Sequence, residues 1–163
     1  DLRGRSRRQR QMCIRDRRIN VRPTPGELQV YHGAGWAQPA TDMLEDSVVR
    51  AFEDSGKIAA VARIGAGIRS DYKLAIDVRR FESDYAGQSL PAATIELNAK
   101  LLHSSDQRVV ASRTFTVARP SSSTDTAAVA AAFEQALTQV TTELVGWTLI
   151  TGQQDSQTLP RAL

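Results

Sequence analysis

The side chains best suited to acid–base chemistry near neutral pH are two histidines, His32 and His103. His103 lies at the edge of a polar turn that begins at Ser104, where we expect an exposed imidazole with no chemical task. The sequence contains no HExxH motif, no nucleophile elbow and no cysteine–histidine pair. It therefore predicts no catalytic residue, no metal ligand and no cofactor-binding residue.

Two further patterns have both a chemical and a structural interpretation. Residues 63–69, RIGAGIR, contain a GxG without the Gly-Lys-Ser/Thr of a phosphate-binding loop, so we interpret them as a bend between strands. Two carboxylate pairs, Asp77 with Glu82 and Asp71 with Asp84, alternate with basic residues along one stretch. Alternating charge of this kind is typical of solvated cross-strand pairs on the polar face of a strand. The structural interpretation is favoured in both cases.

Trp36, in the segment GAGWAQP, is the strongest candidate for contact with another molecule. One interpretation is an aromatic side chain that packs at a strand-to-helix corner, and the other is an exposed anchor for a protein partner. Tyr31 and His32 lie in the same segment, and we retain all three residues as candidate partner contacts. Trp147, at the end of a helical stripe, fits core packing better.

Residues 1–18 contain eight arginines and two aspartates, a composition typical of an arm that binds nucleic acid or anionic lipid. A back-translation of Arg7–Arg17 nevertheless looks like a common sequencing-library adapter that ends in a transposon end. We therefore interpret residues 1–18 as an adapter artefact without ordered structure, and we expect the native N-terminus to be lost upstream of about Ile19. The single cysteine, Cys13, then serves neither a disulfide, nor a metal, nor a lipid anchor.

Excluding this segment changes the charge of the chain. Of the 21 basic and 18 acidic residues, 13 basic and 16 acidic remain, so the formal charge changes from +3 to −3. The basic isoelectric point is then no argument for nucleic acid, and we predict no nucleic-acid partner. The remaining length of about 145 residues suffices for one domain, and no run of about eighteen apolar residues predicts a membrane span.

An amphipathic helix is predicted over about Thr41–Ser55. Asp42 and Glu45 have the spacing of a capping box at its start, and Gly56 marks its end. Its apolar positions share one side at helical spacing: Leu44, Val48, Ala51 and Phe52. The helix is therefore expected to lie on an apolar layer.

The remaining elements are mostly strands. Short extended segments at 19–22 and 28–31 flank a Pro/Gly turn, and 58–64 is predicted to be a buried strand. Alternating apolar residues that begin at Tyr72, Ala93 and Val109 predict three long strands in an antiparallel meander.

A second helix follows the strands. Thr124 is its expected N-cap, and an apolar stripe runs from Val129 to Leu144. The fold class is thus α+β, a two-layer sandwich with a mainly antiparallel sheet and two helices packed on one face. We assign 19–150 to this domain and 151–163, which lack periodicity, to a flexible tail.

Several segments, in their order and spacing, resemble one protein family. They are YHGAGWAQPATDML before a helix that ends in FEDSGKIAAV, then DYKLAIDVRRFE, then PAATIELNAKLL with VVASRTF, and finally AAVAAAFEQAL with ELVGW. In this combination the chain resembles the ABC-type transport auxiliary lipoproteins, the PqiC-like family that accompanies MCE-domain lipid transport systems of Gram-negative envelopes. The resemblance covers about Ile19–Trp147.

The resemblance implies a periplasmic protein that an acylated N-terminal cysteine anchors to the outer membrane. It also implies a non-catalytic role beside an ATPase, a permease and an MCE-domain protein in moving phospholipid between membranes, with docking to the MCE component. The signal peptide, the lipid-bearing cysteine and the early strands of the family are absent from this fragment. A homo-oligomer is compatible with the resemblance.

Three alternatives stay open at this point. The first is a domain that itself carries lipid in a cleft between sheet and helices, and the second is a structural lipoprotein of outer-membrane assembly. The third alternative is a small α+β hydrolase, for which no nucleophile with a base is visible. Neighbouring genes for an ATPase, a permease and an MCE protein would separate transport from assembly.

Overall fold

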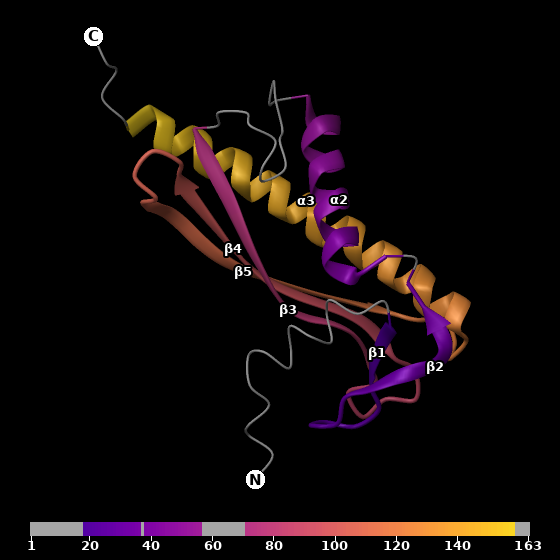
Figure 1. Ribbon diagram of the computed structural model, residues 1–163. Coiled ribbons are helices and arrows are strands. Elements are labelled where there is room, and N and C mark those ends of the chain that lie inside the picture. The colour runs from indigo at the N-terminus through magenta and orange to yellow at the C-terminus, as the bar shows by residue number, and fades with distance from the viewer. Residues whose placement is uncertain (1–17, 37, 57–70, 159–163) are drawn as a thin grey trace.

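The computed structural model describes residues 18–36, 38–56 and 71–158 as one sheet covered by two helices (Figure 1). The elements in chain order are β1 (Arg18–Arg22), β2 (Gln29–Gly35), α2 (Ala40–Ser55), β3 (Tyr72–Asp84), β4 (Ala92–His103), β5 (Val109–Pro120) and α3 (Thr126–Thr158). The strand order in the sheet is β2-β1-β3-β4-β5. The predicted α+β sandwich, with a mainly antiparallel sheet, is confirmed.

Some predictions concern residues outside this description. They are the artefact segment up to residue 17, the strand at 58–64 with its RIGAGIR bend, and the last residues, 159–163. Arg18, which we had placed in the artefact segment, is the first residue of β1.

The long strands form the predicted meander, in which β3 pairs with β4 and β4 with β5, both antiparallel. Along β4 alternate residues are fully buried beneath the helices, among them Ile95, Leu97 and Ala99. In β3 the predicted alternation stops at a bulge between Val78 and Arg80, after which Phe81 faces the core. The extra residue shifts the pattern by one position.

β1 joins the sheet differently from the meander. It runs antiparallel to β2 but parallel to β3, with Asn20 opposite Glu82. A parallel neighbour requires a crossover, and α2 lies in that connection between β2 and β3. This crossover places α2 beside α3 over the same face of the sheet (Figure 1).

α2 ends as predicted but begins differently. Gly56 adopts a left-handed conformation, with φ of 62°, and its N–H donates to the carbonyl of Glu53. The predicted capping box is wrong, because the helix begins at Ala40 and no side chain caps it. Asp42 instead lies inside the first turn, where its charge still favours the positive helix end.

α3 is longer than predicted at its C-terminal end. It begins at Thr126, so Thr124 is not its N-cap, and the amide of Val129 donates to the carbonyl of Asp125. The helix continues to Thr158, so the prediction that regular structure ends at about Ile150 is wrong. The last turns of α3 are held to the sheet by polar contacts, described below, and not by an apolar stripe. The sequence there therefore lacks the apolar periodicity that predicts a helix. None of the described helices has the length and hydropathy needed to cross a bilayer.

Candidate functional site

A groove opens where the segment before α2 meets the two helices. Its volume is about 340 Å³, and it is lined by Trp36, Gln38, Met43, Ser47, Arg50 and Leu137. We call this surface the Trp36 groove. It joins an apolar floor to a polar rim, an arrangement that suits recognition of a side chain or an alkyl group.

Trp36 is both part of the core and part of this surface. Its ring meets Phe81 and Phe133 edge to face, with centroid distances of 6.1 and 5.1 Å, and these two phenylalanines stack at 5.1 Å. Phe81 and Phe133 are buried, whereas Trp36 is half-buried. The contacts support the interpretation of Trp36 as a packing residue, and the same ring also lines the groove. Contact of Trp36 with a partner stays a prediction.

The other two candidate contacts lie in β2. Tyr31 packs against the core, and its hydroxyl group lies 3.2 Å from Oγ of Ser83 on β3. Burial, with the nearby Tyr31, raises the pKa of Tyr85. Tyr31 does not line the Trp36 groove, and the side chain of His32 lies outside the described residues.

Two polar residues that line the groove, Gln38 and Arg50, both bond to Asp46 of α2. Gln38 donates from Nε2 to a carboxylate oxygen of Asp46 at 3.1 Å, and this bond links the segment before α2 to the helix. The Nε of exposed Arg50 donates to the backbone carbonyl of Asp46 at 3.4 Å. The rim thus presents one guanidinium beside an apolar floor.

A second polar site, which sequence reasoning missed, lies at the far end of α3. His103 Nε2 is 2.6 Å from Oδ2 of Asp155, and the Tyr72 hydroxyl donates to the same oxygen at 2.9 Å. Arg108 approaches the other carboxylate oxygen at 3.5 Å. We call these four residues the Asp155 cluster. The prediction of an exposed, idle His103 is wrong, because the unexpected last turns of α3 cover it.

The electrostatics of the Asp155 cluster follow from these bonds. Burial alone would raise the pKa of Asp155, but the hydrogen bonds from Tyr72 and His103 outweigh it and lower that pKa below its ordinary value. Burial and the bond to Asp155 raise the pKa of the Tyr72 phenol. The cluster therefore favours a charged carboxylate beside a neutral phenol, an arrangement that stabilises the helix end.

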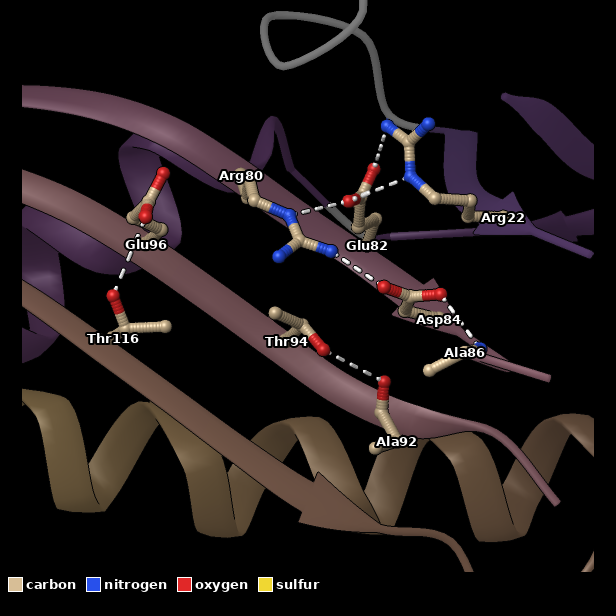
Figure 2. Close-up of polar contacts among 9 residues, drawn as sticks. All are labelled: Arg22, Arg80, Glu82, Asp84, Ala86, Ala92, Thr94, Glu96 and Thr116. Atoms are coloured by element: carbon tan, nitrogen blue, oxygen red, sulfur yellow. Dashed lines mark hydrogen bonds and ion pairs between the residues drawn. The ribbon is translucent and has the colours of Figure 1, made fainter. Parts of the chain in front are cut away.

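The helix-free face of the sheet carries a third polar group (Figure 2). Glu82 is only 3% exposed and accepts bonds from Nε and Nη2 of Arg22, at 3.1 and 3.0 Å, and from Nε of Arg80 at 2.7 Å. Arg80 also pairs with Asp84. The expectation of a solvated charge is therefore wrong for Glu82, which ties β1 to β3, whereas Asp77 is exposed beside Arg79.

These polar groups offer no metal site within residues 18–36, 38–56 and 71–158. No three His, Cys, Asp or Glu side chains converge there in a way that could hold an ion. The buried side-chain polar atoms described are all hydrogen-bonded.

Comparison with known proteins gives a consistent result. Residues 13–145 match the family described as ABC-type transport auxiliary lipoprotein component. The crystal structure of protein XCC0632 from Xanthomonas campestris is 95% identical, with a TM-score of 0.87 over 90% of this chain and 82% of that one. A crystal structure of an uncharacterized protein, 16% identical, shares the fold with a TM-score of 0.67 over 83% of this chain and 84% of the other.

A more distant relative is longer. The uncharacterized protein bll6063 of Bradyrhizobium diazoefficiens is 30% identical over 115 residues, which cover 71% of this chain. The match covers 30% of the Bradyrhizobium protein, so this chain corresponds to less than a third of that relative.

Proposed function

Because the chain belongs to the ABC-type transport auxiliary lipoprotein family, we propose that it is a non-catalytic accessory of an MCE-type lipid transporter. It docks on the MCE-domain protein and assists the transfer of phospholipid between the envelope membranes. The full-length protein resides in the periplasm and is held at the outer membrane by a lipid anchor. The docking surface is the Trp36 groove, with Tyr31 and His32 of β2 as neighbouring contacts.

The observation that carries this proposal is the exposure of a rigidly held aromatic ring. Trp36 is fixed by Phe81 and Phe133, so little side-chain entropy is lost when a partner covers it. Met43 beside it is an adaptable apolar contact, and Arg50 supplies a guanidinium at the rim. Tryptophan and arginine around an apolar floor are typical of interaction hot spots.

A binding measurement with purified MCE-domain protein of the same transport system tests the proposal. Met43→Lys puts a charge into the apolar floor and should weaken binding about tenfold or more, which corresponds to about 1.4 kcal/mol. Met43→Leu is the matched control and should bind as the native protein does. Asp77→Asn, on the helix-free face, changes the net charge by the same +1 and controls for a general charge effect.

Unchanged binding by Met43→Lys, in protein whose thermal unfolding is also unchanged, would reject the groove as the docking surface. Absence of any binding between the native proteins would reject the MCE partnership itself. The two results are distinguishable because the second needs no variant.

A lipid carrier is the second candidate function, and one observation favours it. The volume of the groove, about 340 Å³, falls at the lower end of the range of about 300–1,000 Å³ typical of ligand pockets. Arg50 at the rim suits a phosphate group. Native mass spectrometry of delipidated protein with labelled phospholipid tests this candidate, and absence of a bound lipid would exclude it.

A further inference from the structure

β5 forms one edge of the sheet and is long for an edge strand. It spans 12 residues, pairs with β4 along its length, and has no second strand beside it within the described part of the chain. An exposed edge presents a row of unpaired amides and carbonyls to solvent. Such a row can bind an extended segment from another molecule.

The register identifies which backbone groups are free. The amide of Ser121 donates to the carbonyl of Pro91 at 2.8 Å, so these two residues form a hydrogen-bonded pair. Hydrogen-bonded pairs alternate along an antiparallel ladder, so the odd-numbered residues of β5 are the ones bonded to β4. The amides and carbonyls of the alternate residues therefore point away from β4. These residues are Ser112, Thr114, Thr116 and Ala118.

The side chains along this edge leave it accessible. The four outward residues are small and exposed, and Thr in particular favours extended structure. From Val109 to Arg119, β5 contains no proline, lysine or acidic residue, the residue types that often guard an edge. Its bulge opposite Leu101 and Leu102 lies near the start of the strand, outside this row.

Two arginines give the edge a charge preference. Arg113 and Arg119 are exposed, and both are odd-numbered residues, so they share the helix-side face of β5. The guanidinium of Arg113 lies 5.0 Å from the ring centroid of Phe115. Opposite charges across a strand pair are favourable, and like charges are not.

We propose that the β5 edge binds an extended segment of a partner protein that carries carboxylates opposite Arg113 and Arg119. The two arginines are six positions apart, which corresponds to about 20 Å along a strand. The segment would therefore add one strand to the sheet and carry acidic residues at six-residue spacing. A second copy of β5 is a poorer partner for this edge, since it would place arginines but no carboxylates beside Arg113 and Arg119.

This surface is distinct from the Trp36 groove. The groove is lined by α2, the segment before it and Leu137 of α3, whereas the edge belongs to β5 alone, at the side of the sheet away from β2. A variant that damages one surface leaves the other intact. Failure of this proposal and failure of the proposed MCE docking can therefore be told apart.

Selection of peptides from a random library of segments of about ten residues tests the proposal. The selected peptides are then tested on Thr114→Pro, which removes an outward amide but no backbone bond to β4. It also removes the bond from Nδ2 of Asn98 to Oγ1 of Thr114, a loss that Thr114→Val shares. Thr114→Val is the matched control, because it keeps the amide and the extended preference. We expect acidic residues six positions apart, about tenfold weaker binding to Thr114→Pro, and native binding to Thr114→Val.

Hydrogen exchange and charge reversal complete the experiment. A bound peptide should slow exchange of the four outward amides about tenfold, and Arg113→Glu with Arg119→Glu should shift the selection from acidic to basic peptides. The charge-reversal variant keeps the test valid even if Thr114→Pro folds poorly. Peptides that leave these amides unprotected, a library without binders, or self-association that Thr114→Pro abolishes would each overturn the proposal.

Discussion

Near its start α3 is attached to the sheet by aromatic packing, whereas near its end it is attached by directed polar bonds. At the first site Phe133 stacks on Phe81 of β3 and meets Trp36 edge to face. At the second, Asp155 is bonded by Tyr72 and His103, at the ends of β3 and β4 that lie farthest from Phe81. One helix thus depends on two kinds of attachment.

The difference between the two attachments determines how each responds to conditions. Apolar contacts have no direction and do not depend on protonation, so the aromatic site should persist across the pH range. The Asp155 cluster depends on the charge of one carboxylate and on the position of its donors. The first site should therefore determine global stability, and the second should determine how far α3 extends.

The most damaging change we predict is Phe133→Ala at the aromatic site. Phe133 is 2% exposed, and removal of a buried phenylalanine ring costs about 3–5 kcal/mol in the free energy of unfolding. Urea unfolding followed by far-ultraviolet circular dichroism measures this loss. Phe133→Leu, as the control, should lose less; equal losses would show that aromatic stacking, rather than volume, dominates.

Trp36→Ala should have the next largest effect. The ring is already partly exposed, so we expect a loss of about 1–3 kcal/mol from reduced burial and from two lost edge-to-face contacts. The same urea experiment measures it. A variant as stable as the native protein would mean that Trp36 contributes only to the surface and not to the core.

Asp155→Ala should release the end of α3 with a smaller effect on global unfolding. We expect amide exchange in the last two turns of α3 to be about tenfold faster, while exchange near Phe133 is unchanged. Gln154→Ala, at the exposed neighbouring position, is the control and should leave exchange as it is. Equal acceleration along the whole helix would show that the two attachments are one cooperative unit.

The smallest predicted effect is a change with pH in the stability difference between the native protein and Asp155→Ala. The pKa of Asp155 is lowered in the folded state, so its contribution is full above the ordinary carboxyl pKa of about 4 and is lost as pH falls through the lower folded value. The pKa of Tyr72 is raised, so its contribution is full below about 10 and is lost as pH rises through the higher folded value. Stability curves of the native protein and Asp155→Ala should therefore converge at both extremes, and a constant gap would contradict this assignment.

Most of the fold was predictable because its signals are local. The stripe of α2 and the alternation of β4 repeat at the spacing of their own elements, and burial of Leu44 and Ile95 confirms both. The bulge at Arg79 was not predictable, since it depends on pairing with β4 rather than on the sequence around it.

The polar attachments were harder to predict from the sequence. Tyr72, His103 and Asp155 are far apart in the chain, and His103 and Asp155 lie beside polar residues that predict exposure. Only the pairing of β3 with β4, which puts Tyr72 opposite His103, brings them together beneath α3. In contrast, the segment around Trp36 carries a local signal, because a tryptophan before a helix is unusual by itself; its contact with a partner stays a prediction.

The position of β1 bears on how the domain responds to mechanical force. Although β1 is the first of the described elements, it is an interior strand, hydrogen-bonded to β2 on one side and β3 on the other. At its last residue, Arg22 forms two bonds to the buried carboxylate of Glu82 (Figure 2). A tension applied on the N-terminal side of β1 is thus shared by two ladders and this ion pair, which must yield together before the strand leaves the sheet.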